Sequence, residues 1–504
     1  MSVPDRCTVL VVGGGPGGSY AAAVLAREGI DTVMLEADVF PRYHIGESML
    51  PSLRNYLGFI DLDSTFDSYG FTKKTGAAFR LSPERREGFT DFVGTGGPQN
   101  YSWNVVRSEA DNLMFRHAGK CGANIFDGVK VDSINFAPWA SESELSLVKD
   151  AAGAGATSLD RPVSAKYTHK IDDVSGVITF DYIIDASGRS GLLNTKYLKN
   201  RSYNQQLKNV AIWGYWEGAG EYGAGTKRAN SPYFEALQDE SGWAWFIPLH
   251  DGTTSVGIAM QEQLAKEMKA ASANTKDFYH KAVKLAPDVN KLLDSGKLIS
   301  ELRSASDYSY NSSSYAIPYA RVVGDAGCFI DPFFSSGVHI AITGGLSAAT
   351  SICAAIRQDC LEQIAAQWHS NKIREAYARF LFVVLGAYKQ MRNQKEFVLS
   401  DFGEDNFDRV FSFFGPTIQG AADATNKITQ AEFAKTVAFL SRSVEQKFSA
   451  ARDDEVFLDE AILNQFRQNQ TRSAKTMNDF TTDIIDGRAP RLVKGSLGLI
   501  DLNV

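Results

Sequence analysis

The sequence predicts an α/β protein in which a doubly wound parallel sheet is joined to an antiparallel sheet and a helical C-terminal region. The N-terminus reads as a strand, a glycine-rich turn, a helix and a second strand, which is how a doubly wound sheet begins. Residues from about 71 to 179, and three segments between 209 and 260, are β-prone stretches broken by Gly and Ser clusters. After residue 335, helical periodicity dominates as far as about residue 447. These three observations predict the fold class.

The opening unit follows from local composition. Thr8–Val12 is apolar and β-branched, as a buried parallel strand requires. The Ala-rich segment 19–29 that follows the turn is strongly helix-forming, and Gly29 is placed to end that helix. Thr32–Leu35 is the second strand and ends at Glu36. The N-terminus is therefore predicted to form a βαβ unit.

Later elements are predicted from similar patterns. Residues 181–188, DYIIDASG, carry the paired Ile residues of a buried parallel strand that returns to the first sheet. The segment Lys149–Ala165, rich in Ala and Gly, is expected to be an inserted surface loop. The tail after Ser473 carries no readable signal. Three segments, with a Gly-rich loop at 217–225 after the first, read as antiparallel strands: Asn209–Trp216, Trp243–Pro248 and Thr254–Met260.

The composition is that of an ordinary globular protein and excludes disordered, collagen-like and coiled-coil chains. The 504 residues are 44% hydrophobic and 22% charged. The net charge is −7 and the pI is about 5.6. Because an acidic surface repels polyanions, we expect neither a nucleic acid nor an anionic membrane as a partner.

The sequence favours a reducing, cytoplasmic location. The N-terminus runs directly into a buried strand without the charged and apolar regions of a signal peptide. Apolar runs such as Phe380–Tyr388 are far shorter than a membrane span. The cysteines are odd in number, dispersed and without CxxC spacing, so we expect neither a disulfide framework nor a metal site. They are Cys7, Cys121, Cys328, Cys353 and Cys360.

The glycine-rich turn satisfies the pattern GxGxxG between a strand and a helix. Glycines there allow a tight turn and a close approach of the backbone to a pyrophosphate, whose charge the helix N-terminus favours. Glu36 ends the next strand, where a carboxylate accepts hydrogen bonds from ribose hydroxyls. A glycine-rich turn and a surface Glu are each common, but together they predict a dinucleotide site. Its glycines are Gly13, Gly14, Gly15, Gly17 and Gly18.

A distant Gly-Asp pair favours FAD over NAD as the dinucleotide. Gly324 and Asp325 follow an apolar, strand-like segment and precede the helix expected at 336–348. In the glutathione-reductase-type FAD fold such a pair supplies a carboxylate to the ribityl chain of the flavin. By itself the dipeptide is a common turn. Residues 185–188, DASG, resemble a strand end that lines the same pocket, although a purely structural role explains them equally well.

Four further segments carry recognisable motifs. Residues 41–51 read PRYHIGESMLP and residues 70–79 read GFTKKTGAAF. Residues 243–248 read WAWFIP, and residues 329–337 read FIDPFFSSG. In this order they resemble motifs of the flavin-dependent halogenases, in particular the fungal enzymes that chlorinate free phenolic polyketides of the resorcylic lactone type. With the glycine-rich turn, the resemblance covers about two thirds of the chain.

The resemblance implies roles for residues in these motifs. Lys74 would be the catalytic lysine, which meets the hypochlorous acid formed when chloride attacks a flavin hydroperoxide. Lys73 is its internal control, because adjacent side chains of a strand point to opposite faces. A single lysine is otherwise most often a solvated surface charge. The resemblance also implies cofactor contacts, and with it we assign to the FAD site Arg42, Glu47, Arg107 and Val338.

Two more pairs take their roles from the resemblance. Trp243 and Trp245 would separate the flavin from the organic substrate and so prevent its direct hydroxylation. Core packing explains them equally well from the sequence alone. Ser336 and Gly337 stand at a helix start, where free backbone N–H groups can hold a chloride ion. An ordinary Ser N-cap is compatible with that role.

The chain departs from the tryptophan halogenases at one position. Those enzymes carry a glutamate between the Pro and the Ser of the FxxPxxSxG motif, and Phe334 occupies the matching position here. That acid orients the chlorinating agent and accepts the ring proton. Its loss points away from indoles and toward rings that are already activated, such as phenols and resorcinols. Phe333 and Phe334 also suit an apolar aromatic substrate.

The sequence therefore predicts a two-component halogenase that uses FADH2, O2 and chloride or bromide to halogenate an electron-rich phenolic ring. No second GxGxxG suited to NAD(P)H is found, so a separate flavin reductase is expected as a partner. A flavin monooxygenase is one alternative, but it would not need Lys74 together with both tryptophans. A catalytically inert FAD-binding protein is another, but it would have no reason to keep the lysine and halide motifs.

The predicted organisation has two parts. Residues 1–345 form the halogenase core, and 346–504 form a mostly helical region that covers the substrate. Within the core, a discontinuous FAD domain alternates with a β-sheet substrate part. The FAD domain takes about 1–80, 100–130, 180–200 and 300–345, and the substrate part takes about 81–99, 131–179 and 201–299.

Overall fold

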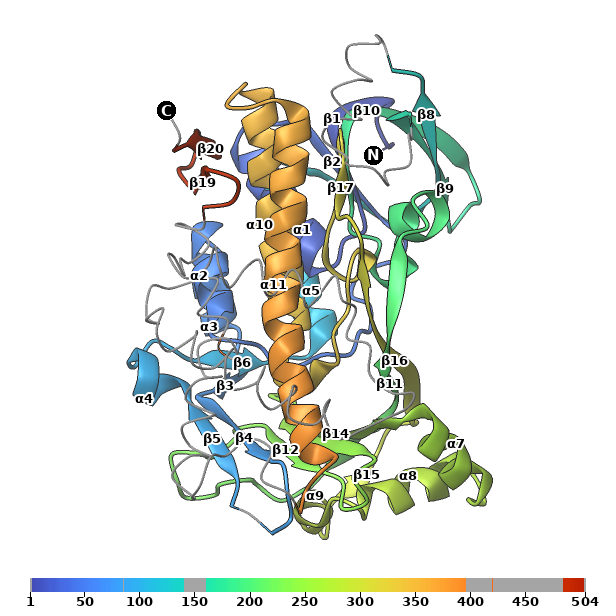
Figure 1. Ribbon diagram of the computed structural model, residues 1–504, viewed down its shortest axis with the longest axis vertical. Helices are drawn as coiled ribbons and strands as arrows, with labels where there is room; N and C mark the ends of the chain where they lie inside the picture. Colours follow the sequence, from blue (N-terminus) through green and yellow to red (C-terminus); the bar gives the residue numbers. More distant parts are fainter. Residues whose placement is uncertain (1, 85, 140–159, 396–418, 420–483, 503–504) are drawn as a thin grey trace, which may run out of the picture.

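The chain folds around two large sheets and a set of helices that connect them (Figure 1). The structure, a computed structural model, describes residues 2–84, 86–139, 160–395, 419 and 484–502. The predicted loop at 149–165 and the helical periodicity beyond residue 395, including Phe411–Phe414, lie largely outside these residues.

The first sheet has eight strands and contains the predicted βαβ unit. Its path runs β17-β18-β10-β1-β2-β7, with β9 paired to β10 and β8 paired to β9. The central pairs β1–β10, β1–β2, β2–β7 and β10–β18 are parallel. The strands are β1 (Arg6–Val12), β2 (Thr32–Glu36), β7 (Asn124–Asp127), β8 (Val129–Ala137), β9 (Arg161–His169), β10 (Ser175–Asp185), β17 (Ala316–Ile317) and β18 (Ala320–Val322).

Strand β1 is buried on both faces, as its apolar sequence predicted. Val9 and Val11 pack against the helix side of the sheet, whereas Leu10 and Val12 pack against β8, β9 and β10 on the other side. Alternate side chains of a strand point to opposite faces, so a strand covered on both sides needs an unbroken apolar run.

The second sheet is mixed, mostly antiparallel, and lies at the opposite end of the molecule in Figure 1. Its path runs β15-β11-β14-β13-β12-β4-β5, with β16 paired to β11. The strands are β4 (Gly76–Arg80), β5 (Gly88–Asp91), β11 (Arg201–Glu217), β12 (Tyr233–Ala236), β13 (Gly242–Pro248), β14 (Thr253–Gln261), β15 (Lys297–Leu298) and β16 (Arg303–Ser312).

Strand pairing differs in two places from the expected division of the core. The strands within 131–179 extend the first sheet through β10, whereas we placed them in the substrate part. Strand β16, which lies in the segment 300–345 that we gave to the FAD domain, pairs with β11 of the second sheet. A β-prone pattern predicts a strand but does not say which sheet edge it joins.

Two small antiparallel pairs complete the strands. The strands β3 (Thr72–Lys74) and β6 (Ser102–Asn104) form the first, and β19 (Arg488–Arg491) and β20 (Gly498–Asp501) form the second. The helices are α1 (Pro16–Arg27), α2 (Ser52–Phe59), α3 (Asp63–Ser68), α4 (Phe92–Gly96), α5 (Arg107–Lys120), α7 (Glu262–Ala270), α8 (Thr275–Val283), α9 (Pro287–Leu292), α10 (Gly337–Ile356) and α11 (Glu362–Met391). Short turns are η1 (Gly188–Ser190), η2 (Leu192–Tyr197), η3 (Gly324–Ala326) and η4 (Pro332–Phe334).

Helices α10 and α11 tie the two sheets together. Helix α11 runs along the molecule from β17 and β18 of the first sheet toward the second sheet (Figure 1). Helix α10 packs between α1 and α11. It is the one helix in the described residues that is long and apolar enough to cross a membrane, and 83% of that apolar stretch is buried inside the protein. It is therefore placed as a core helix.

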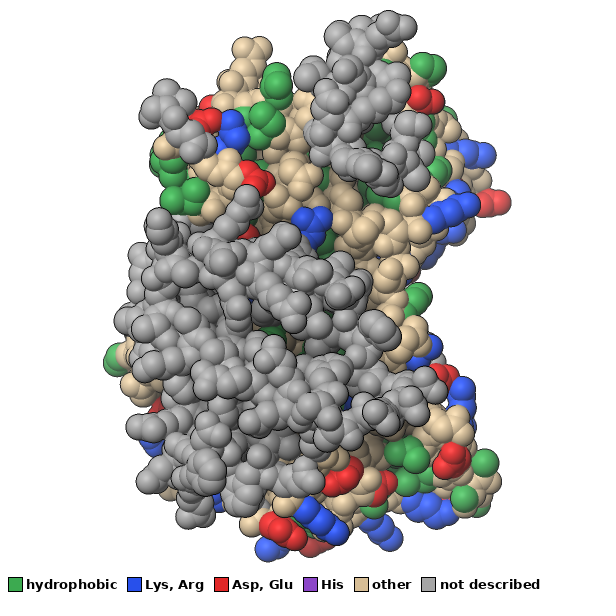
Figure 2. All heavy atoms as spheres, viewed as in Figure 1, with side chains coloured by type: hydrophobic (Ala, Val, Ile, Leu, Met, Phe, Trp, Pro, Cys, Tyr) green, Lys and Arg blue, Asp and Glu red, His purple; other side chains and the backbone are tan. Residues whose placement is uncertain are grey.

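The visible surface carries charges of both signs. On the face in Figure 2, basic and acidic side chains alternate along the lower and right-hand edges of the described part. This mixture accords with the small net charge of −7. All five cysteines are free thiols, and no group of His, Cys, Asp and Glu in the described residues is arranged to hold a metal ion.

Candidate active site

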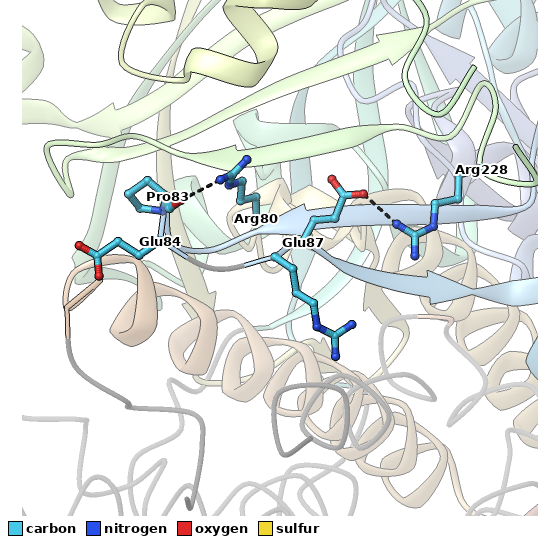
Figure 3. A pocket seen from close by; sticks show the side chains of 6 residues that line it. Arg80, Pro83, Glu84, Glu87 and Arg228 are labelled. Carbon is cyan, nitrogen blue, oxygen red and sulfur yellow. Dashed lines mark hydrogen bonds and ion pairs between the residues drawn. The ribbon is translucent and has the colours of Figure 1, made fainter. Parts of the chain in front are cut away.

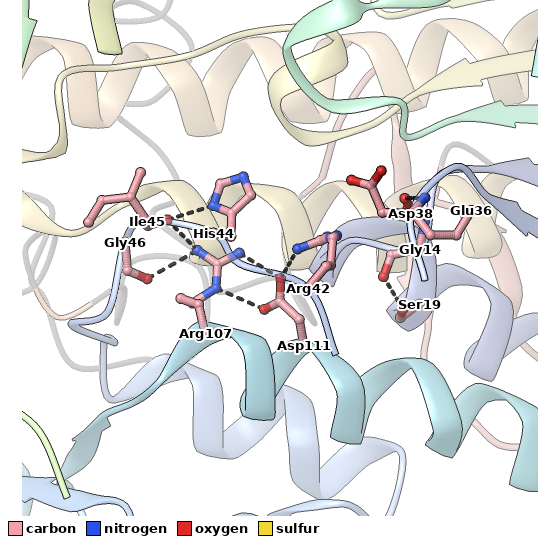
Figure 4. Close-up of polar contacts among 10 residues, drawn as sticks. All are labelled: Gly14, Ser19, Glu36, Asp38, Arg42, His44, Ile45, Gly46, Arg107 and Asp111. Carbon is pink, nitrogen blue, oxygen red and sulfur yellow. Dashed lines mark hydrogen bonds and ion pairs between the residues drawn. The ribbon is translucent and has the colours of Figure 1, made fainter. Parts of the chain in front are cut away.

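The glycine-rich turn and Glu36 form one hydrogen-bonded unit (Figure 4). The Gly14 N–H donates to Oε2 of Glu36 at 2.6 Å, and the Asp38 N–H donates to Oε1 at 2.8 Å. Gly13 has φ +102°, and a Cβ there would lie 2.2 Å from the carbonyl oxygen of Ala186. Only glycine fits that position without a shift of the backbone. The turn is thus held in shape by the acid that the sequence identified.

The start of helix α1 fits an anionic group. Its N-cap, Gly15, supplies no side-chain cap, so the N–H groups of the first turn are not capped by a side chain. The guanidinium of Arg42 is close, because a Cβ on Gly15 would lie 3.5 Å from its Nη2. Free N–H groups, a helix N-terminus and a guanidinium are together the donor set that a pyrophosphate requires. Gly17 and Gly18 allow the close packing of α1, because a Cβ on either would overlap neighbouring atoms.

The segment of residues 41–51, hereafter the strap, is held by a buried arginine. Arg107, at the start of α5, donates to the carbonyl oxygens of Ile45 at 2.8 Å and of Gly46 at 3.1 Å (Figure 4). The same guanidinium binds both carboxylate oxygens of Asp111, at 2.8 and 3.0 Å. Arg42 shares that carboxylate at 3.0 Å. Arg107 is 5% exposed and Asp111 is 1% exposed.

The pKa of Asp111 lies below its ordinary value. Burial alone would raise the pKa, but the charge and hydrogen bonds of Arg107, together with Arg42, outweigh it. Asp111 is therefore the buried counter-charge for two arginines, both of which were expected at the FAD site. Sequence reasoning missed it, although its spacing of four residues from Arg107 on a helix is a readable signal.

Asp325 lies on η3, just beyond β18 of the first sheet. Its carboxylate accepts no hydrogen bond from the described residues, and burial raises its pKa while Arg189, Arg107 and Arg201 oppose that rise. The oxygens of this carboxylate can therefore accept hydrogen bonds from the hydroxyl groups of a ribityl chain. Asp185, by contrast, is satisfied by the N–H groups of Ser187 and Leu193, which supports the structural role for the DASG segment.

Lys74 is a buried amine next to the strap. It is 1% exposed, and its Nζ donates to the carbonyl oxygen of Met49 at 2.9 Å and lies 5.2 Å from the ring centre of Phe92. Desolvation by burial lowers its pKa to about 7. Lys73 is exposed and lies 4.6 Å from the ring centre of Tyr101. The two lysines thus point to opposite sides, as strand geometry predicted.

The side chains of Trp243 and Trp245 share one face of β13 and enter the same aromatic cluster. Their ring centres are 5.6 Å apart, and Trp243 is 5.2 Å from Phe333. Phe334 follows at 4.8 Å from Phe333. These four side chains, called here the aromatic wall, are nearly or fully buried. These side chains pack as a hydrophobic core. Core packing therefore accounts for them, and a second role in separating the flavin from the substrate is compatible with it.

A polar network that sequence reasoning missed supports the aromatic wall. The indole N–H of Trp243 donates to the hydroxyl of Tyr388 at 2.9 Å. That hydroxyl donates to Asp331 at 2.7 Å, and the amide of Asn209 lies 3.0 Å from the same carboxylate oxygen. Asp331 also accepts the N–H of Phe333 at 3.1 Å. One buried acid thus positions the wall, and Tyr388 brings α11 to it.

The start of α10 differs from an ordinary Ser-capped helix. Ser336 is at the N-cap position but makes no side-chain cap bond, and its buried Oγ has no hydrogen-bond partner among the described residues. Gly337 begins the helix and is exposed, and Val338 follows, packed partly against the helix-side core of the first sheet. Ser335 has φ +56°, which turns the chain into the helix. The backbone N–H groups here are not capped by this serine.

A cavity of about 530 Å³ lies elsewhere, at the end of β4 and β5 (Figure 3). Of its charged side chains, Arg228 and Glu87 pair with each other, and Arg80 pairs with Asp288 outside the lining. Arg80 donates to the carbonyl oxygen of Pro83 at 2.7 Å, and Arg228 binds Glu87 at 2.8 Å. None of the predicted site residues lines this cavity, so it does not mark the active site.

The first sheet defines a class of protein: an FAD-binding oxidoreductase, with Glu36 and Asp325 at two of its strand ends. Comparison with known proteins gives the particular family. The tryptophan halogenase family model matches residues 8–120 and 147–399. The chain belongs to this family. It is a flavin-dependent halogenase, an enzyme that uses reduced FAD, O2 and a halide.

Curated relatives match the whole chain. The flavin-dependent halogenase ascD of Acremonium egyptiacum is 56% identical, over 99% of this chain and 93% of that protein. The sulochrin halogenase gedL of Aspergillus terreus is 48% identical, over 99% and 94%. Among solved structures, the myxobacterial chondrochloren halogenase CndH matches with a TM-score of 0.67 and 24% identity, over 87% of this chain and 97% of that one. These findings confirm the expected fold class and activity and do not favour the monooxygenase or the inert protein.

The buried ion pair beneath the strap predicts a large stability effect. Asp111→Asn should lower the free energy of unfolding by about 3 kcal/mol or more, because it leaves Arg107 buried without its counter-charge. Urea denaturation measures this change. Asp181→Asn is the control: its pair with Arg6 is exposed, at 37% and 66%, and should contribute less than about 1 kcal/mol. Equal losses in the two variants would contradict the role given to Asp111.

Proposed function

We propose that the enzyme chlorinates or brominates an electron-rich phenolic ring of a polyketide natural product, with Lys74 as its catalytic lysine. One observation carries this proposal: a fully buried amine, with a pKa near 7, lies against the strap and 5.2 Å from the ring centre of Phe92. The presence of Phe334 in place of an acid, and a relative named as a sulochrin halogenase, support a small organic substrate that is itself activated.

The cofactor contacts follow from the charges described above. Reduced FAD, when bound, supplies with O2 and the halide a hypohalous acid. The glycine-rich turn and Arg42 would hold its pyrophosphate, Glu36 its ribose and Asp325 its ribityl chain. Arg107 and Glu47 would fix the strap beside it, and Val338 would pack at the start of α10. In this assignment the first sheet binds the cofactor and the second carries the substrate side.

Lys74 acts after the oxidant has formed. A neutral amine can accept the halogen from hypohalous acid, with loss of the amine proton, or hold the acid by a hydrogen bond. Burial favours this neutral form near pH 7, because it lowers the pKa of Lys74. The aromatic wall would keep the organic ring away from the cofactor, and the N–H groups at Ser336 and Gly337 would hold the halide.

A separate NAD(P)H-dependent flavin reductase is proposed to supply the reduced cofactor, and the enzyme is proposed to act in the cytoplasm. The support for the reductase is the single dinucleotide motif in the sequence, and the support for the cytoplasm is that all five cysteines are free thiols, as a reducing compartment keeps them.

The two lysines give the sharpest test of this mechanism. Lys74→Ala should abolish halogenated product while FAD binding and oxidation of reduced flavin continue, because the amine acts after hypohalous acid is made. Lys73→Ala should keep substantial activity, since its side chain points away into solvent. In the wild type, halogenation should fall as the pH drops below about 7, because Lys74 becomes protonated and only the neutral amine can accept halogen. Product is measured by LC–MS, and a reversed result would assign the catalysis to the wrong lysine.

The halide site is tested by two small substitutions. Ser336→Ala should raise the KM for chloride by less than about threefold, because the backbone donors remain. Gly337→Ala should raise it by about tenfold, since a helical Cβ tilts toward the N-terminus and would intrude where the halide is proposed. A Cβ at Gly337 meets no atom within 4 Å, so the fold should tolerate it. An unchanged KM in Gly337→Ala would remove this site from consideration.

The substrate class is tested with a phenol and its methyl ether. We expect ionisation of the phenol to activate the ring, in place of a carboxylate at position 334. The free phenol should then react well and its methyl ether poorly. Chlorine should enter ortho or para to the hydroxyl, where phenolate electron density is greatest. Free tryptophan should react hardly at all. Similar rates for phenol and ether would refute this reasoning, and a product heavier by oxygen instead of chlorine would favour hydroxylation.

A further inference from the structure

Glu47 of the strap ends a chain of hydrogen bonds that leads to the protein surface. Its Oε1 accepts from the hydroxyl of Tyr215 at 2.7 Å. The hydroxyls of Tyr215 and Tyr43 are 3.0 Å apart, and the indole N–H of Trp213 donates to Tyr43 at 2.7 Å. Tyr43 is 40% exposed, whereas Glu47 is 2% exposed. The chain therefore joins solvent to a buried acid.

The geometry fixes the direction in which this chain donates. An indole N–H can only donate, so the oxygen of Tyr43 accepts from Trp213. Tyr215 gives its proton to Glu47, and Tyr43 must then give its own proton to Tyr215. Every O–H in the chain points toward the carboxyl group, and Tyr43 keeps one lone pair with which to accept from water.

The second oxygen of Glu47 makes no hydrogen bond of ordinary geometry with the described residues. Oε2 is buried, and the hydroxyl of Ser255 is a donor close to the carboxyl group without such a bond to Oε2. An unpaired buried oxygen of this kind is costly for a carboxylate but suits a carboxylic acid, which can carry its proton there.

The overall reaction requires such a delivery. Reduced FAD gives two electrons and the halide two, and O2 accepts all four to become two waters. Those waters contain four hydrogens: two come from FADH2, one from the substrate ring and one from solvent. One proton must therefore enter the closed site from outside in every turnover.

We propose that Glu47 is the acid that supplies this proton to the site, and that Tyr43 and Tyr215 reload it from solvent. As the proton on Oε2 leaves, Tyr215 passes its proton to Oε1, Tyr43 passes its proton to Tyr215, and water restores Tyr43. Rotation of the carboxyl group returns the proton to Oε2. The inference rests on the proposed position of FAD beside the strap.

The charges around Glu47 agree with this role. Burial raises the pKa of Glu47 to about 7, while Tyr215, the nearby Ser255 and the charge of Arg107 oppose the rise and Asp251 adds to it. The pKa of Tyr215 is raised by burial and by Glu47, so that phenol stays protonated and passes protons without ionising at rest. Glu47 therefore exchanges its proton near neutral pH, which suits a general acid.

A matched chain in the same protein provides the control. The indole of Trp216 donates to the hydroxyl of Tyr279 at 2.9 Å, and that hydroxyl donates to the carbonyl oxygen of Val256 at 3.0 Å. The order of indole, phenol and acceptor is the same, but the last acceptor is a backbone carbonyl that cannot carry a proton onward. Tyr279→Phe removes a buried hydroxyl without touching the proposed route.

The protonation of Glu47 is tested first without turnover. Infrared titration of the FAD-free protein should show a protonated-carboxyl band that disappears as the pH passes about 7. This band should be absent in Glu47→Gln and should persist to higher pH in Tyr215→Phe, because the lost hydrogen bond favoured the carboxylate. Glu235, whose pKa burial also raises to about 7, keeps its band in all variants. No difference between wild type and Glu47→Gln would overturn the proposal.

Proton delivery is tested next by the rate at which hypohalous acid forms. An added amine traps the acid while reduced flavin is supplied at a constant rate. Glu47→Gln should lower this rate by about a hundredfold, and Tyr215→Phe by about tenfold with a larger solvent deuterium isotope effect. Tyr43→Phe should lose less, since water can replace an exposed hydroxyl, and Tyr279→Phe should match the wild type. If Glu47→Gln fails to fold, Tyr215→Phe decides. Wild-type rates and isotope effects in Tyr215→Phe would overturn the relay, whereas a wild type that makes hypohalous acid without halogenating phenols would count only against the proposed substrate.

Discussion

The buried ion pair between Arg107 and Asp111 is the contact on which the site depends. The guanidinium of Arg107 donates to the carbonyl groups of Ile45 and Gly46 and thereby fixes the path of the strap. The strap then continues beside β6: Val105 donates to the carbonyl of Glu47, and Met49 donates to that of Trp103. Since β6 also pairs with β3, the strand that bears Lys74, one backbone arrangement positions the acid and the amine together.

Desolvation shifts the pKa values of Glu47 and Lys74 in opposite directions, and both shifts end at about the same value. Burial disfavours whichever form is charged, so it raises the pKa of Glu47 and lowers that of Lys74, in each case to about 7. Both side chains can therefore be neutral at the same pH without an ion pair between them. A closer approach would have favoured a salt bridge, with a charged amine that could neither accept halogen nor leave the acid its proton. The strap keeps them apart by pointing Glu47 to the second sheet and the carbonyl of Met49 to Lys74.

The elements with a local signal were predictable from the sequence, and the long-range partners were not. The βαβ unit, the acid at Glu36 and the opposite faces of Lys73 and Lys74 follow from patterns a few residues long. Tyr215 lies 168 positions from Glu47, and Tyr388 lies 145 positions from Trp243. Such contacts arise when the second sheet and α11 fold onto the strap and the wall, and no local pattern records them. For the same reason the sequence predicted strands in 131–179 but placed them in the substrate part, whereas they extend the first sheet.

In the proposed reaction, the strap and the aromatic wall serve two different proton transfers. One proton enters and is consumed in making water, whereas one leaves the substrate ring when halogen replaces it. An acid at position 334 would place an ionisable group on the substrate side and let it exchange protons there. With Phe334 instead, the wall is apolar, and its polar anchor Asp331 is already engaged by Tyr388, Asn209 and the backbone of Phe333. In the proposed route, the proton for oxidant formation comes through Glu47 of the strap, and the departing ring proton is carried by the substrate's own hydroxyl or by water. A phenolic substrate fits this division because its hydroxyl can ionise, whereas an indole has no comparably acidic group with which to replace the missing carboxylate.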